Sequence, residues 1–336
     1  MLDERKAAIL RTVVEEYIET AQPVGSGHVA RSPAVRVSAA TVRNEMAVLE
    51  QEGYLQQPHT SAGRVPTDKG YRFFVDHLAQ PGRLERVQVE RVRDFFDTSH
   101  GAIEQLLQDT SRLLANLTDY AAVVIGPSPE AATIRSIQVV GLSGRVAMVV
   151  LVLSNGAVES LQLELQEDVA DQHLGAATAH LQAHAGGLTL VGLSEPPSTG
   201  DEVVDGLIAS VLAAVRDEAS HDEDTVFLGG ASRMAAAFDA VEVVRKVLVA
   251  LEQQYVVVSL LRDVIGRGLT VAIGAEHGVE PLVACSVVVA PYAVEGEPVG
   301  TIGVLGPTRM NYPQALAAVE VVSERLGDRL SDGSVR

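Results

Sequence analysis

The sequence predicts an α+β protein of several domains, on three observations. Its 336 residues are enough for two or three domains of about 100–200 residues each. Helical patterns predominate in the first 118 residues, and strand-like runs, a helical block and further strands follow. The charge is also divided. Residues 1–80, called the head below, carry a net charge of −1, whereas residues 81–336, the body, carry −17.

The overall charge argues against nucleic-acid binding only when it is averaged over the whole chain. A net charge of −18 predicts repulsion from phosphate, yet residues 26–72 contain six basic and four acidic side chains. The single cysteine, Cys285, excludes an internal disulfide and fits a reducing cytoplasm, which is the expected location. The apolar run 146–153 is too short to cross a bilayer, and no secretory signal follows Met1, so no membrane association is expected.

The head begins with three predicted helices. Apolar residues recur at helical spacing in residues 3–20, and Pro23 and Gly25 end that helix. A short second helix is expected over residues 26–31. Ser38 is suited to cap a third helix, residues 39–52, which Gly53 closes.

The third helix has an outer face suited to reading DNA. Val42, Met46 and Leu49 are spaced to face the core, which turns Arg43 and Asn44 outward. Arginine and asparagine are suited to bidentate contacts with guanine and adenine, respectively. The arrangement matches a helix-turn-helix. A three-helix bundle with a solvated polar face is the alternative that the helices alone leave open.

The residues after the third helix favour the helix-turn-helix over the plain three-helix bundle. Short strands are expected at 54–57 and 64–66 around a turn, and Thr67 is suited to cap a fourth helix, residues 68–78. A hairpin directly after such a helix is a wing. Its polar residues suit phosphate or minor-groove contacts, and two cations follow on the fourth helix. These residues are His59, Ser61, Arg64, Lys69 and Arg72.

Four stretches of the head resemble the HrcA family of bacterial heat-inducible repressors. They are residues 23–26 (PVGS), 42–49 (VRNEMAVL), 53–55 (GYL) and 58–74 (PHTSAGRVPTDKGYRFF). The resemblance covers residues 1–78. It implies a winged helix-turn-helix that represses heat-shock chaperone operons by binding double-stranded DNA at an inverted-repeat operator. It also implies a homodimer, kept active by the GroEL chaperonin until heat-unfolded proteins compete for that chaperonin.

The candidate DNA-binding residues follow from the outer face of the third helix, the wing and the fourth helix. The resemblance implies major-groove entry for the third helix and backbone or minor-groove contacts for the wing. The complete set is Ser38, Thr41, Arg43, Asn44, His59, Ser61, Arg64, Lys69 and Arg72.

The body reads as an α+β domain with an insertion. After a hinge at Pro81-Gly82, an amphipathic helical stretch is expected over residues 80–118. Strands are expected at 121–125, 136–141, 145–153, 157–165, 269–273, 282–290 and 299–304, with a helical block at 168–254 and a last helix at 312–330.

The resemblance implies that the body is a GAF-like domain interrupted by an inserted dimerising domain, and residues 302–312 match best. The predicted domains are residues 1–79, the winged helix; 80–120, a helical linker; 121–164 with 256–330, the GAF-like domain; and 165–255, the inserted dimerisation domain.

Other constellations predict no chemistry. His180 and His184, with His173 nearby, lack the glutamate of a zinc-binding H-E-x-x-H pattern, and Cys285 lies in an apolar run typical of a buried strand. No phosphate-loop or G-x-S-x-G string occurs. We therefore expect no catalytic residue, cofactor or metal. A regulator that senses a metabolite through the GAF-like domain remains the alternative function.

Overall fold

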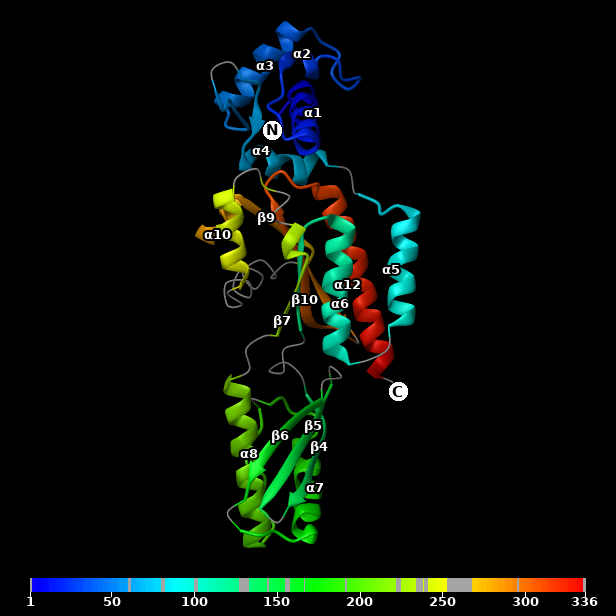
Figure 1. The fold of residues 1–336 in the computed structure, drawn as a ribbon, viewed down its shortest axis with the longest axis vertical. Helices are drawn as coiled ribbons and strands as arrows, with labels where there is room; N and C mark the ends of the chain where they lie inside the picture. The colour runs from blue at the N-terminus through cyan, green and yellow to red at the C-terminus, as the bar shows by residue number, and fades with distance from the viewer. Residues whose placement is uncertain are drawn as a thin grey trace.

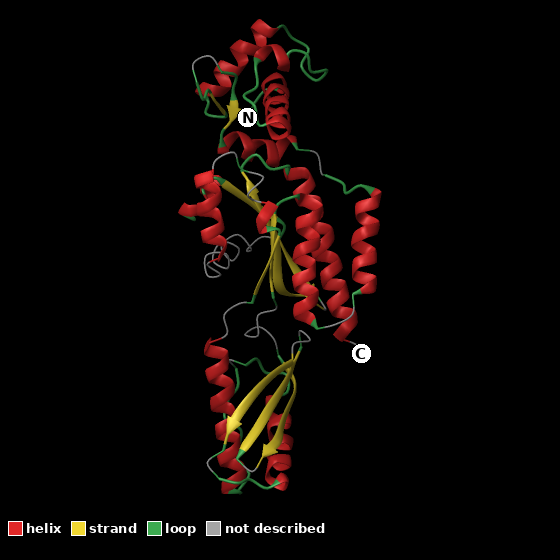
Figure 2. Cartoon of the chain, in the orientation of Figure 1, coloured by secondary structure: helices red, strands yellow, loops and turns green. Residues whose placement is uncertain are grey.

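A computed structural model describes residues 2–336, except residues 60–61, 80–81, 100–101, 127–132, 144, 155–157, 166, 191, 222–224, 234–237, 239–240, 253–267, 295 and 335–336. The described chain is elongated, with the head at one end, a five-stranded sheet in the middle and a three-stranded sheet at the other end (Figure 1). Figure 2 shows that helices line the sheets of the body. No described helix is both long and apolar enough to cross a membrane.

The head has the predicted order of elements. Its helices and strands are α1 (Glu4–Thr20), α2 (Ser26–Val29), α3 (Ala39–Gln51), β1 (Leu55–Gln56), β2 (Val65–Pro66) and α4 (Asp68–Phe73). Ser38 caps α3 as predicted, because its side chain accepts a hydrogen bond from the backbone N–H of Thr41. Gly53, at φ +80°, follows α3 in the left-handed conformation that closes a helix.

Two head helices differ from their predicted form. The second helix ends at Val29 instead of residue 31, and the backbone N–H of Arg31 bonds to His28 in a tighter turn. The fourth stops at Phe73 and continues as a π-helical turn, η1 (Phe74–Leu78). Hydrophobic spacing over four or five residues is too short a pattern to distinguish these turn types from an α-helix.

The five-stranded sheet lies in the middle of the molecule. Its strands are β3 (Ala121–Ile125), β7 (Val226–Gly229), β8 (Thr270–Ile273), β9 (Cys285–Val294) and β10 (Glu297–Pro307), in the antiparallel order β7-β3-β10-β9-β8. Helices α6 (Ile103–Thr118) and α12 (Tyr312–Ser334) contribute to the hydrophobic core on one face, which includes the head, and α10 (Val241–Glu252) packs on the other. The predicted helical stretch 80–118 is in fact two helices, α5 (Arg86–Thr98) and α6.

The three-stranded sheet has its own core. Its strands are β4 (Ile134–Ser143), β5 (Val146–Leu153) and β6 (Val158–Glu164), with β5 central. Helices α7 (Asp171–Ala185) and α8 (Glu202–His221) pack on one face of this sheet. We call residues 134–221 the distal unit.

The predicted grouping of the body strands is wrong in part. Of residues 121–164, only β3 belongs to the five-stranded sheet, because β4, β5 and β6 pair only with one another among the described strands. The chain leaves the five-stranded sheet after Ile125 and returns at β7, inside the segment predicted to be helical. Helix α10, assigned to the insertion, packs on the five-stranded sheet. Local patterns mark strands but not their partners.

Candidate nucleic-acid interface

Helix α3 presents the predicted reading residues at the surface. Val42, Met46 and Leu49 are buried as predicted, and this anchors one side of the helix in the core of the head. Arg43 and Asn44 are exposed on the outer side, and neither has a side-chain partner within the described part of the chain. Both side chains therefore keep their full hydrogen-bonding capacity for a ligand.

The start of α3 is polar and closely packed. The hydroxyls of Ser38 and Thr41 lie 3.0 Å apart, and Ser38 is exposed. Ala39 and Ala40, also exposed, add little bulk beyond the backbone. A groove wall can therefore approach this end of the helix closely.

The wing is fixed to the rest of the head at its base. Strands β1 and β2 pair through Leu55 and Pro66, and Arg64 exchanges two backbone hydrogen bonds of 2.9 Å with Val24. A Cβ on Gly63 would lie 2.4 Å from the Val24 carbonyl oxygen, so this close approach requires glycine. His59 is exposed in the turn, whereas Ser61 lies outside the described residues.

Arg64, predicted to contact DNA, has an ion-pair partner within the head. Its Nε donates to Glu50 Oε2 at 2.9 Å, and its Nη2 lies 2.8 Å from the same oxygen. Glu50 lies in the last turn of α3, so this ion pair connects the helix that carries Arg43 to the base of the wing.

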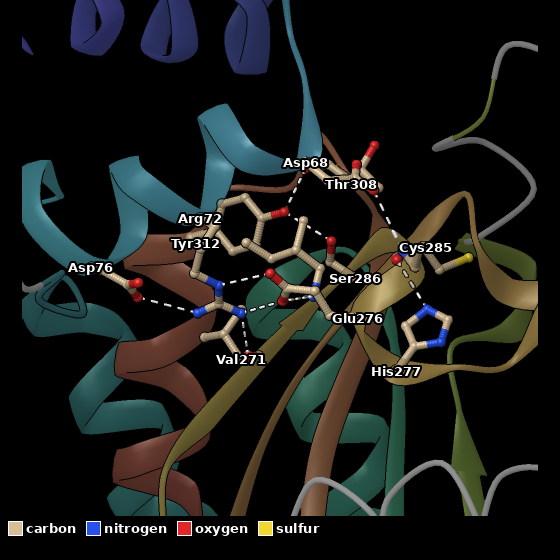
Figure 3. A network of polar contacts seen from close by, with 12 residues as sticks. Asp68, Arg72, Asp76, Val271, Glu276, His277, Cys285, Ser286, Thr308 and Tyr312 are labelled. Carbon is tan, nitrogen blue, oxygen red and sulfur yellow. Dashed lines mark hydrogen bonds and ion pairs between the residues drawn. The ribbon is translucent and has the colours of Figure 1, made fainter. Parts of the chain in front are cut away.

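Lys69 and Arg72, on α4, are also engaged. The Lys69 ammonium donates to the backbone oxygen of Glu52 at 2.8 Å and lies 4.4 Å from the centre of the Tyr54 ring. Arg72 points toward the body, where it pairs with Glu276 (Figure 3). Its Nη2 also donates to the Val271 carbonyl at 2.6 Å.

The structure describes eight of the nine predicted residues, all except Ser61, and divides them into two groups. Ser38, Thr41, Arg43 and Asn44 come together on α3, with His59 in the wing, and three cations have partners inside the chain: Arg64, Lys69 and Arg72. The partners of two of these cations, Glu50 and Glu276, were not predicted from the sequence. No local signal identifies them, since they lie 14 and 204 residues from the arginines they bind.

Two of the histidines considered for metal binding have structural partners, and the cysteine is buried. His184 Nδ1 donates to the His180 carbonyl at 2.8 Å, and His180 Nε2 donates to the Pro197 carbonyl at 2.8 Å. Cys285 is buried in β9, as predicted, and burial raises the pKa of its thiol to about 12. Within the described part of the chain, no group of three or more His, Cys, Asp or Glu is placed to hold a metal ion.

Comparison with known proteins gives consistent matches. Residues 104–316 match the family model described as the HrcA protein C terminal domain. A heat-inducible transcription repressor HrcA of Pelotomaculum thermopropionicum is 38% identical over 98% of this chain and 97% of its own, and one from Nocardia farcinica is 39% identical over the same shares. A crystal structure of a hypothetical protein covers 99% of both chains with a TM-score of 0.63 at 24% identity, which shows a shared fold.

Proposed function

The chain belongs to the HrcA family of heat-inducible transcription repressors, and from this premise we propose that it binds an inverted-repeat operator of chaperone operons as a homodimer. The observation that carries this proposal is α3, whose Arg43 and Asn44 are exposed and unpaired among the described residues at the far end of the molecule. Such a repressor works where the bacterial chromosome lies, in the cytoplasm, and performs no catalysis.

In the proposed complex, α3 enters the major groove. Arg43 reads guanine and Asn44 reads adenine, since these side chains match the donor and acceptor patterns of those bases. Ser38 and Thr41, at the start of the helix, contact the backbone beside it, and the wing places His59 against the flanking phosphates or minor groove. The engaged cations Arg64, Lys69 and Arg72 contribute less to base reading.

A two-fold operator calls for a two-fold dimer, and the open face of the distal unit supports one. The face of β5 turned away from α7 and α8 carries Val146, Met148, Val150 and Val152, all half-buried. The residue register places Val140 beside Met148 and Val158 beside Val152, and these two outer valines are 45% and 62% exposed. An apolar strip of this kind is typical of an interface.

The charge of this face favours a second copy as its occupant. The body carries a net charge of −17, so two bodies repel each other wherever acidic surfaces meet. The residues paired across the centre of the sheet, Gln138 with Val150 and Val150 with Ser160, are uncharged. Two copies can therefore meet at the centre of this face without burying a carboxylate, and Glu164, which pairs with Val146, lies at one end of it.

Heat sensing is proposed to operate through the GroEL chaperonin. In this scheme GroEL holds the repressor in its DNA-binding form, and heat-unfolded proteins occupy GroEL and lift repression. A mobility-shift experiment tests it, with the full chain, an inverted repeat from a chaperone promoter, and GroEL present or absent. GroEL is expected to raise the bound fraction. Binding that ignores GroEL but responds to a metabolite would favour the metabolite-sensing alternative.

Light scattering tests the dimer separately. Val150→Lys places a charge in the middle of the apolar strip and is expected to give a monomer with the secondary structure unchanged. Val203→Lys is the matched control, because Val203 is 47% exposed on α8. A wild-type monomer, or a Val150→Lys dimer, would contradict the proposed interface.

A further inference from the structure

One side of α4 joins the head to the body. Asp68, Tyr71 and Arg72 are spaced three and four residues apart, so they lie on the same side of this helix. That side meets β8 and the following 3-10 turn, η3 (Gly274–His277). The Tyr71 ring packs 5.9 Å from the ring of Tyr312. The joint therefore combines an aromatic contact with polar ones.

An arginine fork forms the centre of this joint. Arg72 Nε donates to Glu276 Oε1 at 3.0 Å, Nη2 pairs with Glu276 Oε2, and Nη1 donates to Asp76 Oδ1 at 3.2 Å (Figure 3). Two parallel bonds between a planar guanidinium and a carboxylate restrict the angle between them. The pair consequently fixes direction as well as distance.

The body side of the joint is held in place. Glu276 Oε2 also accepts the backbone N–H of Ile273 at 2.8 Å. Burial raises the pKa of Glu276, but the bonds from Arg72 and Ile273 outweigh it and lower the pKa, so the carboxylate is charged. Tyr312 is anchored in turn, since its hydroxyl lies 2.8 Å from Ser286 Oγ and donates to the Thr308 carbonyl at 2.6 Å.

The head and body also approach closely at Gly274. This residue has φ +55°, and a Cβ there would lie 2.2 Å from the Asp68 carboxylate. Asp68 accepts the backbone N–H of Ala275 at 3.4 Å beside it. The helix therefore sits directly against the 3-10 turn, with no space for a side chain between them.

The joint leaves the DNA-reading side uncovered. Arg43 and Asn44 are exposed, and α3 lies on the side of the head away from the five-stranded sheet (Figure 1). A joint that hid α3 would block DNA binding. This one holds α3 at a set orientation instead.

We propose that Glu276, acting through Arg72, is a positioning residue that sets the direction of the head and thereby the half-site spacing that the repressor selects. The inference rests on the proposed dimer and inverted repeat. When two heads are held on one particle, the gain from binding both half-sites depends on whether their geometry matches the DNA. A stiff joint gives the increase in affinity at one half-site spacing only, whereas a loose joint gives a smaller increase at several spacings.

Binding measurements on the full chain test this inference. The DNA series holds two half-sites at several spacings, together with a duplex that has one half-site. Glu276→Gln keeps the shape and removes the charge, and Glu280→Gln is the matched control, an exposed acid in the next 3-10 turn, η4 (Glu280–Leu282). Glu276→Gln is expected to lose about tenfold in affinity at the preferred spacing, to flatten the profile, and to keep single-site affinity.

A charge exchange provides the rescue. R72E with E276R restores an ion pair at the same place and is expected to recover part of the spacing preference that either single variant loses. If the exchange and both single variants keep the wild-type profile, the inference is overturned. It is also overturned if Glu276→Gln binds more tightly, which would make the joint inhibitory.

Two further outcomes separate this inference from its premises. If Arg72→Gln weakens single-site binding and Glu276→Gln does not, Arg72 contacts DNA itself and the positioning role is wrong. A wild type that binds one and two half-sites equally would overturn the proposed dimeric function and this inference together. A wild-type spacing preference that Glu276→Gln shares would overturn the inference alone.

Discussion

Helices α3 and α4 of the head carry predicted DNA contacts of the same kind, but their side chains meet different surroundings. On α3, Arg43 and Asn44 point outward and have no partner among the described residues. On α4, Lys69 binds the end of α3, and Arg72 binds the body. A cation near a recognition helix can therefore hold parts of the protein together as well as bind its ligand.

The position of each helix explains the difference. Helix α3 packs with one side on the core of the head and has its other side free. Helix α4 lies between the rest of the head and the five-stranded sheet, where Tyr71 and Phe74 are buried. A charged side chain on α4 beside that junction must pair there to offset its desolvation.

The largest expected effect is on α3. Arg43→Ala should weaken operator binding by roughly 1–3 kcal/mol and relax the preference at one base pair, because a bidentate guanine contact is lost. Asn44→Ala should do the same at an adenine. Binding titrations against single-base operator variants measure both effects. Arg11→Ala, which removes a cation from α1 that pairs with Glu15, is the control.

If the Arg43→Ala variant binds the operator with unchanged affinity, α3 does not differ from α4 in its role at the DNA. The placement of the reading face would then be wrong.

The second effect concerns Arg64. Like the cations of α4, this arginine has a partner within the protein, so we expect it to position the wing. If Arg64 holds the wing through Glu50, then Glu50→Ala should weaken operator binding by about 1 kcal/mol, as Arg64→Ala does, because either change breaks the same pair. If Arg64 contacts phosphate, Glu50→Ala should strengthen binding, since it removes a competing negative charge. The sign of the change, measured in one titration, decides between the roles.

A third, smaller effect depends on pH. The lowered pKa of Glu276 means that its ion pair stabilises the joint above the ordinary glutamate pKa of about 4.3 and that this contribution disappears as pH falls through the lowered value. Glu276→Gln should lower the free energy of unfolding by about 1 kcal/mol or less near pH 7, because the pair is partly exposed. The difference in unfolding free energy should shrink on acidification.

The other ionisable side chains beside the joint, Asp68, Asp76 and His277, are present in both proteins, so their contributions largely cancel in that difference. A difference that grows on acidification would contradict the assigned pairing.

The smallest effect is on Lys69. Lys69→Ala should weaken binding to all sequences about equally, by a few tenths of a kcal/mol, and reduce the salt slope by about one if the ammonium reaches a phosphate. Titrations at several salt concentrations on operator and unrelated DNA measure this. A loss confined to the operator would instead assign Lys69 to base reading or to the shape of α3.

The sequence predicted local features of the fold well because they depend on near neighbours. Ser38 caps α3, Val42 and Leu49 face inward, and β3 spans the predicted residues. Sheet membership was not predictable in this way. The pairing of Ala122 with Gly229 joins residues more than one hundred positions apart, and β7 has only four residues between helices.

The candidate site follows the same rule. The outward position of Arg43 and Asn44 follows from helical spacing within one short segment. The pairing of Arg72 depends on Glu276, which lies 204 residues away in the sequence, in the turn that follows β8. Charge and spacing alone therefore could not separate a side chain that is open to DNA from one that is bound to the body.

The elongated shape and the uneven charge together give the protein a dipole moment. A head of charge −1 lies at one end of the molecule, and the body of charge −17 extends away from it, so the protein has a large dipole moment along its length. The field of DNA exerts a torque on such a dipole and turns the acidic end outward. In the proposed function, this orientation would bring α3 to the DNA first.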